Sequence, residues 1–182
     1  MTRLLLFAAI TLVTVFSACQ SPTRQADRSI LESHALTNAT DLDAKYMVVV
    51  FGFTTCPDIC PTTLLQRESH LASLTPEHRE RVELAFVTVD PTRDTSERLV
   101  QYVTHFSGDF IPVRAEGDAL ATLMQSFRVH ARKVPARTPG QYSMDHSASA
   151  FLIDPIGSVI AEYRYGESQD LIVQSLQTRL DT

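Results

Sequence analysis

The spacing of apolar residues along this chain changes several times, and these changes predict alternating strands and helices. Two predominantly apolar segments, Tyr46 to Phe51 and Val82 to Val89, are typical of strands covered on both faces. Between these runs, Pro61 suits the first turn of a helix. The apolar positions that share one face of this helix are Leu64, Leu71 and Leu74.

The middle of the chain predicts shorter helical segments. Thr75-Pro76-Glu77 begins a turn or a short helix. Thr95 precedes a helix from about Glu97 to Phe106, and its hydroxyl can accept a hydrogen bond from the first helical turn. Asp118 begins a further helix that ends near Phe127.

The last third of the chain has the clearest pattern. Ser149 to Ile153 and Ser158 to Tyr165 are predicted strands, joined by the turn Asp154-Pro155-Ile156-Gly157. Ser168 then precedes a closing helix, whose expected inward positions are Leu171, Ile172, Leu176 and Leu180. This order of elements predicts one α/β domain over 41–182, with a central mixed sheet flanked by helices.

The N-terminal residues are typical of an export signal. Arg3 supplies positive charge, Leu4 to Phe16 is apolar, and Ser17-Ala18 offers small residues before Cys19. The apolar run is too short for a permanent membrane span. We therefore predict a lipoprotein-type signal peptide over 1–18 and lipidation of the Cys19 thiol. The alternative is an ordinary secretory signal followed by an unrelated cysteine.

Residues 19–40 are rich in polar side chains and have little apolar periodicity. They predict a lipid-anchored flexible tether, from Gln20 to about Arg28, and a loosely ordered lead-in. The expected location is the bacterial cell envelope, with the domain facing the periplasm or the outer side. The expected membrane contact is the lipid on Cys19.

Charge and cysteine content narrow the functional classes. The chain has 16 Lys and Arg against 21 Asp and Glu, which gives a net charge of −5. Because no basic patch typical of nucleic-acid or polybasic membrane binding is evident, we expect no nucleic-acid partner. Three cysteines are an odd number for an exported protein, and lipidation of Cys19 leaves one pair.

That pair, Cys56 and Cys60, lies where a buried strand gives way to the first turn of a helix. Positions i and i+4 share a helical face, and the unpaired N–H groups of a helix start favour thiolates. Such a pair can exchange disulfides or hold a soft ion such as Cu(I), and it can also be a merely structural disulfide. The Cys-x-x-Cys spacing of thiol–disulfide oxidoreductases is shorter by one residue.

A histidine could supply the third ligand of a trigonal Cu(I) site. His146 lies in a polar loop, Tyr142 to Ser147, which enters a buried strand. The Pro- and Gly-punctuated segment Val134 to Tyr142 predicts a mobile loop that carries His146 toward or away from the cysteines. The remaining histidines are expected at solvated or half-buried positions; they are His34, His70, His78, His105 and His130.

Three neighbouring polar residues and one methionine also have predicted roles near the dithiol. Asp90, Arg93 and Asp94 predict a salt-bridged turn before a helix, and Asp90 can approach the site because it ends an adjacent strand. Met144 can assist Cu(I) capture, but a packing or surface role is the favoured interpretation.

Four motifs, taken in order, resemble the SCO/SenC family from about Asp41 to Leu180. They are Phe51 to Thr62, Thr88 to Thr95, Asp145-His146-Ser147 and Phe151 to Gly157. The resemblance implies a thioredoxin-like fold and copper binding, with Cys56, Cys60 and His146 as the metal ligands. Cu(I) is the expected ion, and Cu(II) stays open.

The resemblance also implies a membrane-tethered copper metallochaperone that delivers copper to the copper centre of a respiratory cytochrome c oxidase. The expected partner is the copper-binding subunit of the oxidase or another periplasmic copper chaperone. The alternative is a thiol–disulfide reductase that keeps the oxidase copper-site cysteines reduced, with Cys56 and Cys60 as its catalytic redox pair. Whether the protein is an enzyme is therefore open. Peroxide reduction on the same fold fits less well, because it needs one activated cysteine beside an arginine.

Overall fold

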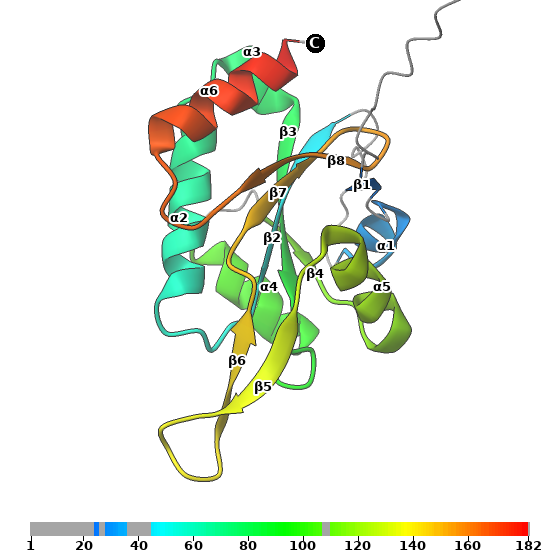
Figure 1. Cartoon of the computed structure of the whole chain (residues 1–182), viewed down its shortest axis with the longest axis vertical. Coiled ribbons are helices and arrows are strands. Elements are labelled where there is room, and N and C mark those ends of the chain that lie inside the picture. Colours follow the sequence, from blue (N-terminus) through cyan, green and yellow to red (C-terminus); the bar gives the residue numbers. More distant parts are fainter. Residues whose placement is uncertain (1–23, 26–27, 36–44, 107–109, 182) are drawn as a thin grey trace, which may run out of the picture.

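The centre of the fold is a mixed six-stranded sheet (Figure 1) in the computed structural model, which describes residues 24–25, 28–35, 45–106 and 110–181. The strands of this sheet are β1 (Arg24–Gln25), β2 (Tyr46–Gly52), β3 (Val82–Thr88), β4 (Phe110–Val113), β7 (Ala150–Ile153) and β8 (Ser158–Tyr163). Their order across the sheet is β1-β8-β7-β2-β3-β4. β2, β3 and β4 are parallel, whereas β7 runs antiparallel to both β2 and β8, and β1 is antiparallel to β8.

Helices cover both faces of the sheet (Figure 1). They are α1 (Arg28–Ser33), α2 (Ile59–Ala72), α3 (Pro76–Glu80), α4 (Ser96–Thr104), α5 (Gly117–Phe127) and α6 (Gln169–Leu180). Side chains of β2 alternate between the faces: Val49 and Phe51 pack with α1 and α5, whereas Val48 and Val50 pack with α2, α4 and α6. The predicted α/β fold with a central mixed sheet flanked by helices is confirmed.

Most predicted elements are present, with small changes at their ends. At the start of α4, the hydroxyl of Thr95 accepts a hydrogen bond from the N–H of Arg98, as predicted. In α6, Leu171 is 58% exposed, so its predicted inward position is wrong. The inward face is filled by residues that recur every four positions, which leaves Leu171 to the side of it. These buried residues are Ile172, Leu176 and Leu180.

The folded domain includes residues that composition assigns to a tether and lead-in. Arg24 of β1 donates a hydrogen bond to the carbonyl of Phe127 at 2.9 Å, and Leu31 of α1 is 1% exposed. The predicted signal peptide, residues 1–18, and the predicted lipidation site Cys19 lie outside the described residues. Within the part of the chain that is described, no helix combines the length and the apolar character needed to cross a membrane.

A second, two-stranded sheet extends away from the first (Figure 1) and was not predicted. It is a hairpin of β5 (Ala131–Pro135) and β6 (Tyr142–His146). The prediction of a polar loop from Tyr142 to Ser147 is therefore wrong, because Tyr142 to His146 form a strand. The side chains of both hairpin strands are half-buried or exposed, so no run of apolar residues marks them. The short strand β4, which contains Pro112, was also missed.

Candidate metal centre

Both cysteines lie at the carboxyl end of β2, as predicted, where the chain turns into α2. The N–H of Cys56 donates to the carbonyl of Phe53 in this turn, and Cys60 is the second residue of α2. Asp58 occupies the N-cap position, but its side chain makes no capping hydrogen bond. Instead, the Sγ of Cys56 accepts a hydrogen bond from the N–H of Cys60 at 3.4 Å. A backbone donor of the helix start is thus directed at this sulfur and favours its thiolate.

His146 approaches the cysteines from the end of β6. Its Nε2 lies 3.5 Å from the Sγ of Cys60, a residue 86 positions away in the chain. Its Nδ1 lies 2.8 Å from the carbonyl oxygen of Ser147, which can only accept a hydrogen bond. Nδ1 therefore carries the proton in the neutral ring, and Nε2 presents a lone pair to the sulfurs. The edge of the ring packs against Phe53, at 5.6 Å between centroids and an interplanar angle of 87°.

The two sulfurs and the imidazole nitrogen form a compact set of donor atoms. Atoms from Cys56, Cys60 and His146 all lie within 4.8 Å of one another, and they are the one such group found among the described residues. The two cysteines are not joined by a disulfide. Because bonds from a metal ion to sulfur and nitrogen are about 2.0–2.3 Å, a single ion can contact all three atoms after small adjustments. Two thiolates and one imidazole suit a soft ion such as Cu(I), so the residues fit the metal that the resemblance implies.

The two thiols differ in acidity and in access. A hydrogen bond from the side chain of Cys60 lowers the pKa of Cys56 to about 4, against the effect of burial. The pairing with Cys56 raises the pKa of Cys60, and burial raises it further. Cys60 is 2% exposed, whereas Cys56 is only half-buried. Cys56 is therefore the accessible and more acidic thiol.

A cavity of about 280 Å³ opens beside Cys56 and His146, whereas Cys60 does not line it. The helix start and the hairpin line it together: Phe53, Cys56, Pro57, Asp58, Ile59, Ser143, Met144, Asp145, His146 and Ala148. Met144 also packs against the buried core, which agrees with the packing role favoured for it. The cavity gives an approaching molecule access to Cys56 without unfolding the domain.

Buried polar contacts fix the turn before Cys56. Asp94 is fully buried, and its carboxylate accepts hydrogen bonds from the N–H and hydroxyl of Thr54 at 3.0 and 2.6 Å. The hydroxyl of Thr88 donates a third, at 2.6 Å. The predicted salt-bridged turn is confirmed by the ion pair of Asp90 with Arg93. Asp94, however, belongs to this hydrogen-bonded network, a role that the sequence did not reveal.

Gly52, the last residue of β2, lies where no side chain fits. A Cβ atom at this position would lie 2.9 Å from the Sγ of Cys60 and 2.7 Å from Cε2 of Phe86. The glycine therefore lets the sulfur pack directly against the strand. Sequence reasoning missed this role, although a glycine inside an apolar strand next to a dithiol is a signal of close approach.

The other histidines lie outside the donor cluster, as predicted, but one of them is not solvated. His70 is 3% exposed, and its Nδ1 lies 3.1 Å from Nη1 of Arg67, which is 1% exposed. Burial, and secondarily the charge of Arg67, lowers the pKa of His70 to about 4. The prediction of a solvated or half-buried His70 is therefore wrong. His130, which is exposed, lies near Ser147, with its Nδ1 2.8 Å from the hydroxyl oxygen.

A mixed sheet with two cysteines at the carboxyl end of a central strand, faced by a histidine from a later segment, defines a thioredoxin-like protein with a dithiol–imidazole site. The chain belongs to the SCO1/SenC family, whose family model matches residues 30–181. It is 35% identical, over 141 residues, to a protein of Stutzerimonas stutzeri named as a candidate copper-binding protein; the match covers 77% of this chain and 68% of that protein.

Solved structures of this family have the same fold. Apo Sco1 from Thermus thermophilus is 35% identical, with a TM-score of 0.67, and the match covers 77% of this chain and 82% of that one. ScoI from Bradyrhizobium japonicum, solved with copper bound, is 29% identical, with a TM-score of 0.66, and the match covers 76% and 87% of the two chains. The predicted thioredoxin-like fold and the predicted family are thus confirmed.

Proposed function

We propose that this protein is a membrane-tethered copper metallochaperone that delivers copper to the copper centre of a respiratory cytochrome c oxidase. The observation that carries the proposal is the approach of His146 Nε2 to within 3.5 Å of Cys60 Sγ. A dithiol that serves only disulfide exchange has no need of an imidazole there, whereas a three-ligand copper site does. The copper-bound structure of the Bradyrhizobium japonicum relative supports the same interpretation.

The donor set determines how copper is held and released. The proposed ligands are the thiolates of Cys56 and Cys60 and the neutral imidazole of His146, which is oriented by the carbonyl of Ser147. Because protons compete for all three donors, copper affinity falls as the pH falls. Cys56 is the accessible donor, so a partner's cysteine can approach copper from the cavity side and exchange ligands with it. Cu(I) is the proposed cargo.

The proposed partner and location follow from the family and the N-terminal sequence. The partner is the copper-binding subunit of the oxidase or another periplasmic copper chaperone. The protein is exported, loses residues 1–18 and is anchored in the cell envelope by lipid on Cys19. A Cys19→Ser variant should move from the membrane fraction to the soluble exported fraction. An identical distribution of the variant and the wild type would contradict the anchor.

Copper stoichiometry and ligand identity test the metal role directly. The mature protein, purified after the cell has processed it and then reduced, should bind about one Cu(I) per chain. X-ray absorption should report sulfur and nitrogen scatterers for the wild type and loss of the nitrogen in His146→Ala. Undiminished copper retention in both Cys56→Ser and Cys60→Ser would remove the proposal.

A second function, thiol–disulfide reduction, is favoured by the unequal acidity of the two thiols. The Cys56 thiolate can attack a substrate disulfide, form a mixed disulfide and release one substrate thiolate. The Cys60 thiolate then attacks the Cys56 sulfur and releases the second, so that two electrons pass to the substrate and a Cys56–Cys60 disulfide remains. His146→Ala should leave the reduction of a small disulfide nearly unchanged while copper binding weakens. Equal loss of both activities would argue against a ligand role for His146.

A further inference from the structure

The hairpin that carries His146 is tied to the body of the domain at the opposite end of β6, through Tyr142. Tyr142 begins this strand and His146 ends it, and residues four apart along a strand share one face. The hydroxyl of Tyr142 donates a hydrogen bond to Oδ1 of Asp90 at 2.9 Å. Its backbone carbonyl accepts one from Nη1 of Arg93 at 2.8 Å. Both ends of Tyr142, side chain and backbone, are therefore held by the turn that follows β3.

Arg93 is the centre of this attachment. Its guanidinium carbon lies 3.8 Å from the centroid of the Tyr142 ring and 5.8 Å from that of Phe53. Its Nε is paired with the carboxylate of Asp90, which is 1% exposed and thus fixed in the body of the domain. Phe53 in turn contacts the His146 ring. A continuous series of contacts therefore runs from Asp90 through Arg93 to both ends of the strand.

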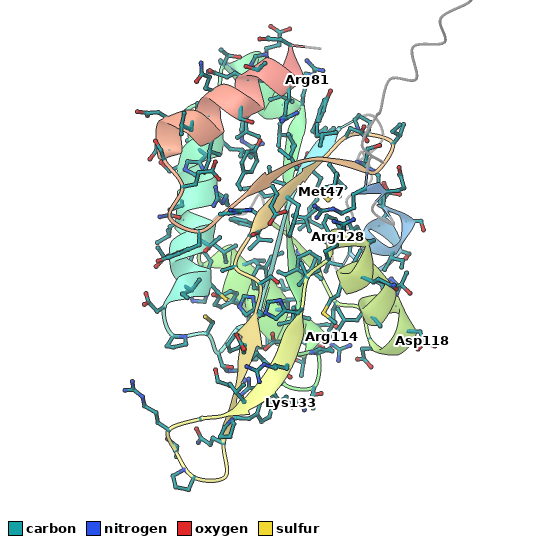
Figure 2. The ribbon with its side chains drawn as sticks, viewed as in Figure 1. Met47, Arg81, Arg114, Asp118, Arg128 and Lys133 are labelled. Carbon is teal, nitrogen blue, oxygen red and sulfur yellow. The ribbon has the colours of Figure 1, made fainter. Side chains whose placement is uncertain are left out.

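The rest of the hairpin extends away from the domain. Lys133, on β5, lies on this outlying part (Figure 2), and its Nζ lies 4.5 Å from the centroid of the Tyr142 ring. The strands pair with each other, Lys133 opposite Met144 and Ala131 opposite His146. The position of His146 thus depends on where the hairpin as a whole is attached.

We propose that Arg93, held by Asp90, is a positioning residue for the metal centre: it clamps Tyr142 and thereby fixes the strand that presents His146 to the two sulfurs. This inference rests on the proposed copper function and deepens it. With the clamp closed, the domain offers two sulfurs and a nitrogen. With the clamp removed, the hairpin moves as a unit and leaves a bare dithiol, the form suited to disulfide exchange.

The test combines variants of the clamp with His146→Ala in a double-mutant cycle on the protein as the cell processes it. Arg93→Gln removes the ion pair and the cation–π contact, and Tyr142→Phe deletes only the hydroxyl. Competition with a Cu(I) chelator should show a loss of affinity of about 10- to 100-fold for Arg93→Gln and a smaller loss for Tyr142→Phe. In the His146→Ala background, Arg93→Gln should cause no further loss, because the clamp acts through the imidazole. Arg98→Gln, an exposed arginine of α4, is the matched control.

Hydrogen exchange of the copper-free protein gives a readout that does not depend on metal. Arg93→Gln should speed exchange of the amides of residues 131–146 by about tenfold or more relative to Arg98→Gln, while the amides of β2 and β3 keep wild-type protection. Unchanged exchange in the hairpin, or the same loss of copper affinity with and without His146, would overturn the positioning role. If His146→Ala alone leaves copper affinity unchanged, the ligand set itself fails, whereas the exchange measurement still decides whether Arg93 holds the hairpin.

Discussion

Gly52→Ala should weaken copper binding and leave the domain folded. The added Cβ would lie 2.9 Å from the Sγ of Cys60, which is 0.5 Å short of the 3.4 Å at which ordinary contact begins. The sulfur must therefore move by about half an ångström, whereas metal–ligand distances tolerate changes of about 0.2 Å. We expect Cu(I) affinity to fall by about tenfold or more.

The same methyl group also presses on the core. It would lie 2.7 Å from Cε2 of Phe86, a fully buried ring, and overpacking of this kind costs about 1–3 kcal/mol. Replacement of glycine in a strand returns about 0.5–1 kcal/mol, because the unfolded chain loses freedom. The net loss of unfolding free energy should thus be at most about 2.5 kcal/mol, small enough for the variant to remain folded.

Two measurements separate these effects: urea unfolding of the copper-free protein and competition with a Cu(I) chelator. The control is Leu176→Ala in α6, which removes a side chain that is 1% exposed and far along the chain from the cysteines. It should cost about 2–5 kcal/mol of stability and leave copper affinity unchanged. Wild-type affinity in Gly52→Ala, or an equal loss of affinity in Leu176→Ala, would refute the reasoning.

Three further predictions concern other groups. Burial lowers the pKa of His70 to about 4, so its contribution to stability is complete above the unfolded-state pKa of about 6.5 and is lost as the pH falls toward 4, by up to about 3 kcal/mol. His70→Gln should therefore make the free energy of urea unfolding depend less steeply on pH between about 4 and 6.5, and an unchanged dependence on pH would contradict this. Because the pKa of Cys56 is lowered and that of Cys60 is raised, iodoacetamide should alkylate Cys56 of the reduced protein at a nearly constant rate from about pH 6 to 8 and Cys60 far more slowly, as mass spectrometry can show. A rate for Cys56 that rises about tenfold per pH unit would exclude a thiolate at this position. Asp94→Ala leaves three donors without an acceptor and should cost about 2–4 kcal/mol in urea unfolding, against about 1 kcal/mol or less for the exposed Asp118→Ala, and similar costs would refute the buried network.

The elements that could be predicted are those in which the sequence pattern itself indicates which residues are buried. β2 and β3 are predominantly apolar because both faces of each strand are covered by helices. β7, β8 and α6 are marked by a turn between two apolar runs and by a helical spacing. In contrast, no residue of β5 or β6 is fully buried, and the hairpin is held by contacts such as Arg93 with Tyr142, which join residues 49 positions apart. A contact between residues so far apart leaves no pattern in the local sequence, so the hairpin could not be predicted from it.

The same division applies to the site. Cys56 and Cys60 could be recognised as a pair because they are four positions apart at a predicted helix start, but they do not share a helical face: Cys56 lies in the turn before α2, and only Cys60 is on the helix. The distance from His146 to Cys60 depends on hairpin pairing and on the attachment at Tyr142, so the sequence could indicate the histidine but not its geometry. The burial of His70 was missed because its partner Arg67, a long cationic side chain, is seldom expected in a core.

The antiparallel pairing of β2 with β7 has a consequence for biosynthesis. Val50 pairs with Ala150, so the strand that leads to the dithiol gains this neighbour only after a hundred more residues have been made. On the export route proposed above, with the N-terminus leading, both thiols would reach an oxidising compartment before the sheet around them can close. During that interval both cysteines would be open to oxidants and to wrong disulfide partners.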